Sequence, residues 1–486
     1  LALVKDGRSA APIVVFEDAP PFTRRAADEL AAYIEKTSGA KPQVIEGKPD
    51  PIPEHAIWVG YQPVMDGLFP DVNFTFEHPE EIVIAANENH LVVAGRDVWI
   101  PDHMKVQLGS RTINGLQQEY GTVNAVYTFL QDFLGVRWLW PGELGTDVLK
   151  RETIAFAPFK HRHHPQFRFR AGLFHIYNLR RQHQGHEWTR FQRVQLDSLD
   201  FSGGHGFTWW WKRFNEIHPE YFALQPDGKR GNCWPGTSTG YRRGVYVKTC
   251  KNNPAVWEQW LAEVEAQLEH NPNQRIFSAA ANDGAYEGYC ICERCQAWDS
   301  ADGTMVPHSW EGLSQEYVAV SDRQVRLANT LGRLLKKRYP EKNYYVNILA
   351  YGNSTPAPAE AVPDDNVIVG GVFGFHFRPD AVHHKLKLDT RKMFHSWADI
   401  TKNFIWRPNI SHTAGWKQGL PYAHPRKAIK DLRLAAENGV MGLHFDSIWG
   451  HWANQGPHYY MLAQMAWNPY ADGEAILEDY YRRAFG

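Results

Sequence analysis

The sequence of 486 residues carries a formal net charge of −2, and 13% of its residues are aromatic. A nearly neutral chain has no field that would collect nucleic acid or an anionic membrane, so we expect neither partner. No run approaches the roughly 18 apolar residues that span a bilayer, and no leader precedes Leu1. We therefore expect a trimmed, soluble protein, secreted or periplasmic in origin.

The length exceeds that of one ordinary core and indicates two domains. Residues 1–160 begin with an apolar strand over 13–16 and an amphipathic helix over 23–37, which Gly39 ends. The elements that follow are a strand over 57–60, a hairpin of 81–86 with 90–95, and a helix over 123–134. Residues 1–160 are thus predicted to form an α/β accessory domain.

The basic stretch 160–165, Lys-His-Arg-His-His-Pro, marks the expected domain boundary. It contains no carboxylate and no cysteine, which favours a solvated linker over a metal site.

In residues 165–486, strand-like segments alternate with helical ones, which is typical of repeated βα units. Two of the expected helices are 254–269 and 320–339. The expected strands are 167–174, 201–207, 243–248, 275–280, 344–349, 367–373, 404–408 and 440–445. Eight strands alternating with helices predict a (β/α)8 TIM-type catalytic barrel.

Polar and aromatic residues follow several of these strands, where the chemistry of such barrels lies. We expect them to converge on one cleft and bind a carbohydrate substrate, because flat aromatic faces suit sugar rings. Large barrel cores also contain many aromatic residues, so the aromatic content alone does not distinguish a sugar-binding cleft from a large core. The expected substrate-binding residues are Arg170, His175, His205, Asn282, Tyr351, His376, Trp406 and Trp449.

Three carboxylates are candidates for catalysis. Cleavage of a glycosidic bond typically needs an acid near the leaving oxygen and a second group that activates water, attacks the sugar or orients it. Asp283 directly follows an apolar strand and is the first candidate for the acid or the orienting carboxylate, with Asp446 or Glu287 as its partner. Structural interpretations also stand: an Asx turn for Asp283, an N-cap for Asp446 and a surface loop for Glu287.

Cys290, Cys292 and Cys295 have the density of metal ligands, but structural zinc needs four. A fourth ligand would come through tertiary contact, from Cys250, Cys233 or His308. A structural metal site, a disulfide and free packed thiols all remain open. Catalytic zinc is not indicated, because no paired histidines accompany the cluster. Nucleotide, phosphate and serine-hydrolase motifs have no fitting context, so we expect no cofactor for catalysis.

Two parts of the chain resemble known families. Residues 26–34 and 127–138 resemble the non-catalytic α/β domain that precedes the barrel in α-glucuronidases and β-hexosaminidases. Residues 218–224, Asn282-Asp283 with the Cys-x-Cys-x-x-Cys loop, and residues 435–440 resemble the barrel of glycoside hydrolase family 163. That family was formerly a domain of unknown function and includes endo-β-N-acetylglucosaminidases that act on N-glycans.

The resemblance implies a glycosidase that acts on a glycan or polysaccharide, hexosaminidase-like in its chemistry. It also implies a glutamate shortly after residues 367–369, where this sequence has Gly374, Phe375 and then His376. Two functions therefore follow from the sequence. One is a glycoside hydrolase that uses carboxylate acid/base catalysis; the alternative is a non-catalytic glycan-binding protein on a degenerate hydrolase barrel.

Overall fold

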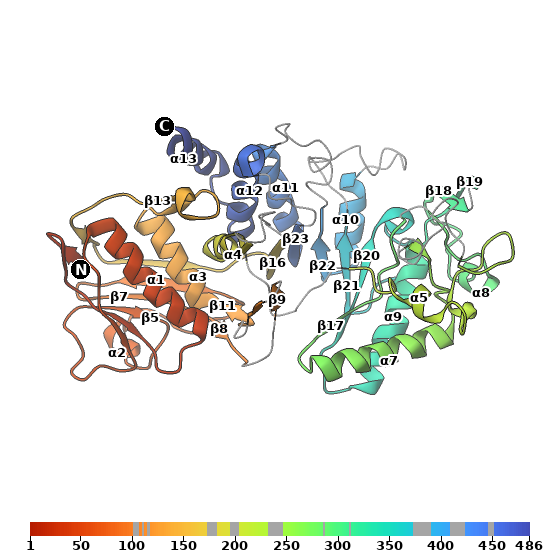
Figure 1. Cartoon of the computed structure of the whole chain (residues 1–486), viewed down its shortest axis with the longest axis horizontal. Coiled ribbons are helices and arrows are strands. Elements are labelled where there is room, and N and C mark those ends of the chain that lie inside the picture. The colour runs from red at the N-terminus through yellow and green to blue at the C-terminus, as the bar shows by residue number, and fades with distance from the viewer. Residues whose placement is uncertain are drawn as a thin grey trace. The chain divides into compact units, whose positions relative to one another are not determined.

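The computed structural model forms two compact units (Figure 1). The first comprises Leu1–Ser198, Lys417–Leu432 and Trp449–Gly486, and the second comprises Leu199–Trp416 and Arg433–Ile448. The described residues are 1–100, 106–108, 111–113, 117–172, 182–194, 204–231, 246–284, 287–310, 313–372, 390–408, 423–445 and 452–486. The domain boundary at 160–165 stays a prediction.

A mixed six-stranded sheet is the centre of the first unit. Its strand order is β15-β6-β7-β5-β3-β4; β3, β4, β5 and β7 pair in parallel, and β6 pairs antiparallel with both neighbours. The predicted hairpin is confirmed. The strands are β3 (Ile13–Val15), β4 (Val44–Glu46), β5 (Ala56–Val59), β6 (Ile82–Ala86), β7 (His90–Gly95) and β15 (Phe159–His163).

Helices α1 (Pro21–Ser38) and α3 (Gly121–Thr128) pack on this sheet, and a π-helical turn (Phe129–Phe133) extends α3. A proline at the first helical position starts α1, since its missing N–H needs no partner there. Gly39 ends the helix with φ 82°, and its N–H donates to the carbonyl of Glu35. Both predicted helices are therefore confirmed.

The basic stretch at 160–165 is largely not a linker, and that prediction is wrong. Its first four residues belong to β15, which pairs antiparallel with β6 at the edge of the sheet. Lys160 and Arg162 are exposed while His161 and His163 are partly buried, which is the alternation of an edge strand. Arg162 also forms a salt bridge of 2.5 Å with Glu81. The charges thus lie on the outer face of a strand.

Five strands of the second unit form a parallel sheet, in the order β23-β22-β21-β20-β17. They are β17 (Ile276–Ser278), β20 (Tyr345–Ala350), β21 (Val367–Gly371), β22 (Phe404–Trp406) and β23 (Gly442–Phe445). Helices connect them, notably α9 (Ser321–Arg338) before β20, α10 (Thr390–Ile400) before β22 and α11 (Pro425–Glu437) before β23. Helix α9 packs on β20 and β21, beside α7 (Pro254–His270). This is the alternating βα pattern that the sequence predicts.

The expected strands at 275–280, 344–349, 367–373, 404–408 and 440–445 are confirmed, with shorter bounds. The expected strand at 167–174 corresponds to β16 (Phe169–Gly172), in the first unit. The described parts of the other two, residues 204–207 and 246–248, contain no strand. The parallel sheet supplies part of a barrel, and the full (β/α)8 barrel stays a prediction.

Shorter elements complete the described chain. The remaining helices are α2 (Met65–Leu68), α4 (Gln182–Phe191), α5 (Trp210–Phe214), α8 (Glu293–Gln296), α12 (Trp452–Trp467) and α13 (Gly473–Phe485), with 3-10 turns at Glu143–Gly145, Pro219–Tyr221 and Gly352–Ser354. The remaining strands are β1 (Ala2–Lys5), β2 (Arg8–Ser9), β8 (Asp97–Val98), β9 (Val106–Leu108), β10 (Arg111–Ile113), β11 (Glu119–Tyr120), β12 (Arg137–Trp138), β13 (Thr146–Asp147), β14 (Ile154–Ala155), β18 (Met305–Trp310) and β19 (Leu313–Val318).

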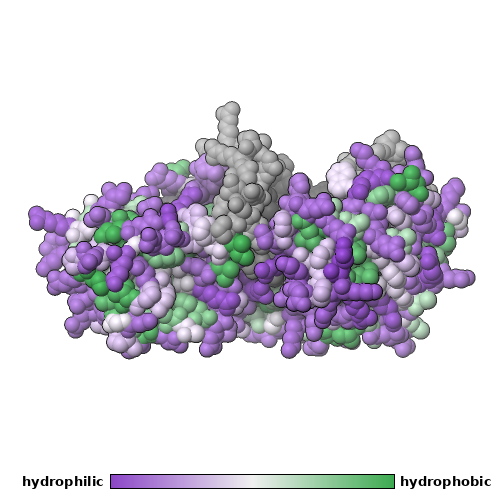
Figure 2. All heavy atoms as spheres, turned by 90° about the horizontal axis from the view of Figure 1, so that it is seen from below, coloured by the Kyte–Doolittle hydropathy of each residue, from purple (hydrophilic) through white to green (hydrophobic). Residues whose placement is uncertain are grey.

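On the face shown in Figure 2, hydrophilic residues predominate and the apolar ones are scattered in small groups. Within the described ranges, no helix has the length and apolar character needed to cross a bilayer.

Buried neutral histidines make the first unit sensitive to acid. His458 in α12 is 2% exposed, and its Nδ1 accepts a hydrogen bond of 3.0 Å from the backbone N–H of His424. Burial lowers the pKa of His458 to about 3 and that of His163 to about 4. The unfolded chain takes up these protons near pH 6.5, whereas the folded unit resists them. The stability that they contribute is therefore complete above that pH and is lost as the pH falls.

We expect the free energy of unfolding to fall by ~1.4 kcal/mol per pH unit for each such histidine below about pH 6.5. Urea unfolding measured at several pH values should show this slope. His458→Gln should reduce the slope by about one proton, since glutamine keeps an acceptor but does not titrate. The exposed His270 supplies the control, His270→Gln, which should leave the slope unchanged. An unchanged slope in His458→Gln would show that His458 is not the titrating group.

Candidate functional site

The candidate site begins where β17 ends. After Ser278 the chain continues through three alanines, of which the first two are buried, to Asn282 and Asp283. Gly284 then turns the chain with φ 84°. Only glycine adopts that left-handed conformation without strain. The turn thus places the Asp283 carboxylate beyond the carboxyl end of β17, the end where parallel sheets carry their sites.

Lys248 and Asn282 hold this turn together. The Lys248 ammonium is buried and donates short hydrogen bonds to the backbone carbonyls of Asn282 and Asp283. The Asn282 side-chain amide is 4% exposed and donates to the carbonyls of Phe207 (3.0 Å) and Val247 (2.8 Å). Asn282 therefore connects three segments of the chain, and these two hydrogen bonds explain why an asparagine stands at this turn.

Asp283 and Tyr351 meet across neighbouring strands. Tyr351 directly follows β20, which pairs in parallel with β17, and its phenol donates a hydrogen bond of 3.2 Å to Oδ1 of Asp283. The same oxygen accepts from the Gly284 N–H at 2.8 Å. Tyr351 is partly buried against Ala280, Leu349 and Val372. Two donors thus fix the orientation of a half-buried carboxylate.

His205 lies beside the same turn. The N–H of the following residue, Gly206, donates to the carbonyl of Ala280 at 3.0 Å, and a Cβ there would lie 2.4 Å from the carbonyl oxygen of Ser278. Only a glycine permits this approach. His205 Nδ1 lies 2.5 Å from the carbonyl oxygen of Ala281, so Nδ1 carries the hydrogen and Nε2 keeps a lone pair.

Burial lowers the pKa of His205, while the Ala281 carbonyl and the charge of Asp283 act in the opposite direction. The ring is therefore neutral near pH 7. Asp283, Tyr351 and His205 together offer an acceptor, a phenol and an imidazole at one edge of the sheet. Such a set can hold the hydroxyl groups of a sugar and move a proton.

The structure uses other expected site residues differently. Glu287 lies in the loop after the turn, where its N–H donates to the Gly284 carbonyl at 3.3 Å. Trp406 ends β22 with its ring fully buried in the interior. Arg170 belongs to the first unit, where it pairs with buried Glu80. The remaining expected residues lie outside the described ranges: His175, His376, Asp446 and Trp449.

The cysteine cluster gains a fourth thiol. Cys250 joins Cys290, Cys292 and Cys295 to form a group of four sulfurs that all lie within 4.8 Å of one another. All four are free thiols. Among the residues described, His308 is not part of this group, and its Nδ1 lies 2.5 Å from the side-chain nitrogen of Asn353. Cys233 lies outside the described ranges.

Sequence reasoning missed Lys248, which no motif marks. It also gave no role to Trp209, three residues after Gly206, whose side chain is 54% exposed. An exposed indole close in sequence to His205 is suited to stack on a sugar ring.

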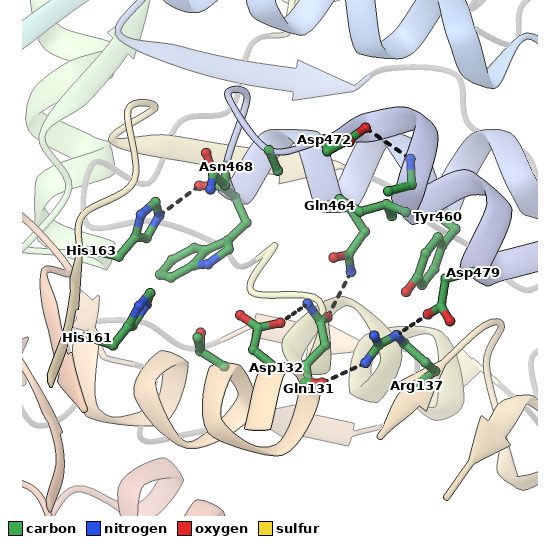
Figure 3. A pocket seen from close by; sticks show the side chains of 15 residues that line it. Gln131, Asp132, Arg137, His161, His163, Tyr460, Gln464, Asn468, Asp472 and Asp479 are labelled. Atoms are coloured by element: carbon green, nitrogen blue, oxygen red, sulfur yellow. Dashed lines mark hydrogen bonds and ion pairs between the residues drawn. The ribbon is translucent and has the colours of Figure 1, made fainter. Parts of the chain in front are cut away.

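The first unit has a cavity of about 350 Å³, lined by residues of β15, the π-helical turn, α12 and α13 (Figure 3). Its polar groups largely pair with one another. Arg137 forms a 2.7 Å salt bridge with Asp479, and the Gln464 amide donates to Gln131 Oε1 at 3.0 Å. The His163 ring lies 3.3 Å from the Trp467 carbonyl. These contacts stabilise the unit, and the cavity does not contain the candidate site.

The fold is one that glycoside hydrolases share. The chain is similar to BtGH115A, a family GH115 4-O-methyl-alpha-glucuronidase with specificity for decorated arabinogalactans. The identity is 12% and the TM-score 0.56, with coverage of 98% of this chain and 59% of that chain. It is also similar to the chitobiase of Flavobacterium johnsoniae, at 8% identity and a TM-score of 0.50, covering 100% of this chain and 70% of that one. These likenesses define a fold class, and this chain spans about 59% of the glucuronidase.

Within that class, the chain belongs to the family described as Domain of unknown function (DUF4838), whose model matches residues 140–486. No curated protein matches the sequence. The specific assignment to glycoside hydrolase family 163 stays a prediction.

The contacts of Lys248 lead to a stability prediction. Lys248→Met removes the donor to two carbonyls of the 282–283 turn, so we expect a loss of ~2–4 kcal/mol in the free energy of unfolding. Hydrogen exchange in residues 279–284 should speed up as the turn opens. The matched control is Lys229→Met, because the Lys229 side chain is 78% exposed. Equal stability and exchange in the two variants would mean that Lys248 does not hold the turn.

Proposed function

We propose that the chain is a glycoside hydrolase whose active site lies at the carboxyl edge of the parallel sheet in the second unit. The observation that carries this proposal is the contact between Asp283 and Tyr351 across β17 and β20. A half-buried carboxylate held by a phenol, beside a neutral histidine, is a group that glycosidic chemistry uses. The fold likeness to a glucuronidase and a chitobiase supports a carbohydrate substrate.

In this proposal Asp283 is the acid that protonates the leaving oxygen, or the carboxylate that orients the substrate for attack. Glu287 or Asp446 supplies the second carboxyl. Tyr351 keeps the Asp283 carboxyl in one rotamer, so little entropy is lost when substrate binds. His205 offers its Nε2 lone pair to a sugar hydroxyl, and Trp209 offers an exposed aromatic face.

The finer expectations from the sequence also belong to the proposal. They are a hexosaminidase-like action, a role in polysaccharide degradation and a secreted or periplasmic location. Catalysis of this kind proceeds through side chains of the chain itself and requires no cofactor. His175, His376 and Trp449 lie outside the described ranges and remain predicted substrate-binding residues. Arg170, Asn282 and Trp406 have the structural contacts described above and are not part of the proposed site.

Asp283→Asn tests the central assignment. We expect hydrolysis to fall by at least ~100-fold, because an amide can neither donate an acidic proton nor carry the negative charge. Glycan binding and the unfolding midpoint should stay close to those of the unaltered chain, since asparagine has the same shape. Turnover is measured on a panel that includes 4-O-methyl-glucuronide-bearing arabinogalactans and chitobiose, and binding by calorimetry with the same panel.

The control for this substitution is Asp302→Asn, because Asp302 is an exposed aspartate of the same unit. It should keep full turnover. Near-normal turnover by Asp283→Asn would remove Asp283 from the catalytic role.

A second function is favoured by one observation, the absence of a carboxylate at Gly374 and Phe375, where the family resemblance implies a glutamate. On this alternative the chain is a non-catalytic glycan-binding protein. Calorimetric binding of a glycan without any product, under conditions in which the chain stays folded, would decide for this alternative. Product release that Asp283→Asn abolishes would decide for the hydrolase.

A further inference from the structure

Four cysteine sulfurs meet in the second unit although they come from two separate stretches of sequence. Cys250 follows the segment that carries Lys248, and the other three form the Cys-x-Cys-x-x-Cys loop after the 282–284 turn. Cys250 Sγ lies 3.6 Å from Cys292 Sγ and 3.7 Å from Cys295 Sγ. Cys290 completes the group, within which no two of the sulfurs lie more than 4.8 Å apart.

The spacing of the sulfurs fits one shared metal ion. Zinc binds thiolates at about 2.3 Å, and the edge of a regular tetrahedron is about 1.6 times that radius, so neighbouring sulfurs should lie about 3.8 Å apart. A disulfide would need a separation of about 2.05 Å, so the 3.6 and 3.7 Å distances exclude a bond between these pairs. The two sulfur pairs that include Cys250 therefore have the spacing expected of ligands that bind the same metal ion.

Backbone donors surround the cluster as they do in metal–thiolate sites. The N–H of Leu224 donates to Cys290 Sγ at 3.2 Å, and the N–H of Asn252 donates to Cys295 Sγ at 3.5 Å. Such bonds orient the sulfurs and stabilise the negative charge of thiolates. Leu224 belongs to a third segment, whereas Asn252 lies two residues after Cys250, so three segments of the chain contribute to the cluster.

Two buried cations lie close enough to interact electrostatically with Cys295: Lys251 and Arg323, each 1% exposed. Arg323 pairs with Asp299, and its guanidinium also donates to the Cys290 carbonyl at 2.7 Å. Lys251 belongs to no ion pair among the described residues. Its ammonium donates to the Gln324 side chain. Zinc bound by four thiolates has a net charge of −2, which buried cations beside it would help to balance.

We propose that Cys250, Cys290, Cys292 and Cys295 bind one zinc ion as a structural site. Four sulfur ligands in a tetrahedron favour zinc among the abundant divalent metals. Four protein ligands also leave no open position for substrate, so the ion acts on the fold. On binding, each thiol loses its proton to water and the sulfur lone pair bonds to the metal, with no change in oxidation state.

The zinc would fasten the loops on which the candidate site depends. Cys250 lies two residues after Lys248, which holds the carbonyls of the 282–283 turn, and Cys290 lies seven residues after Asp283. An ion at the cluster thus connects the segment before Lys251 to the loop that follows the turn. The zinc proposal does not rest on the proposed hydrolase activity, because it concerns ligands and stability alone.

The first test is the metal content of the purified full chain, measured by mass spectrometry of the elements. We expect one zinc per chain and none in Cys292→Ala, which removes the least buried of the four ligands. Cys233→Ala is the matched control, because it removes a cysteine that the proposal leaves outside the site, and it should keep its zinc. A folded, metal-free wild-type chain, an iron-loaded chain or zinc retained by Cys292→Ala would overturn the proposal.

A second measurement needs no variant. A chelator should make four additional thiols per chain reactive toward a thiol reagent and lower the urea midpoint, and added zinc should reverse both changes. Cobalt in place of zinc should give the charge-transfer and ligand-field absorption of a tetrahedral thiolate site. Thiol reactivity that is the same with and without chelator, or a disulfide found among these cysteines by peptide mapping, would refute the site.

Discussion

The buried ammonium of Lys248 is the interaction on which the candidate site depends. A charge with 1% exposure is costly unless oxygen atoms surround it, and here the carbonyls of Asn282 and Asp283 accept its hydrogen bonds. The Asn282 amide then binds the carbonyls of Phe207 and Val247. Side-chain hydrogen bonds, together with one backbone hydrogen bond from the Gly206 N–H to the Ala280 carbonyl, thus join the described segments 204–207, 246–248 and 279–284. This explains how those segments stay together although the first two contain no strand.

That requirement divides the polar residues at the sheet edge into two groups. The side chains of Asn282 and Lys248 donate hydrogen bonds to backbone carbonyls, and Arg170 forms a salt bridge with Glu80 in the first unit. Asp283, Tyr351 and His205 are the members whose functional atoms meet at the edge of the sheet. The Asp283 carboxylate of such a site is rigid, because Lys248 holds the backbone of its turn and the Tyr351 phenol holds its oxygen. Rigidity of this kind is what general acid catalysis needs.

The sulfur cluster extends the same principle. In the described part of the loop from Asp283 to Cys295, the only helix or strand is the start of α8. Hydrogen bonds to Leu224, Gln225 and Ser309 hold the middle of this loop. One end is held by Lys248 and the other by the cluster that includes Cys250. Because Lys248 and Cys250 are two residues apart, one short segment holds both ends of the loop. A metal ion at the cluster would therefore make the loop and the sheet unfold together.

The sequence by itself determined helices α1, α3, α7 and α9, the β6–β7 hairpin and five strands of the parallel sheet, because those depend on local periodicity, caps and glycine stops. It also placed Asp283 at a strand end, since an apolar run followed by Asn-Asp-Gly has few other interpretations. The prediction of a linker at residues 160–163 was wrong, because their basic character drew attention away from the alternating exposure of an edge strand, which pairs with β6. Only the tertiary structure decided that Cys250 joins the cluster, that Lys248 is buried beneath the turn and that Trp406 is interior. Those facts depend on segments that are far apart along the chain, and no local pattern records which of them will meet.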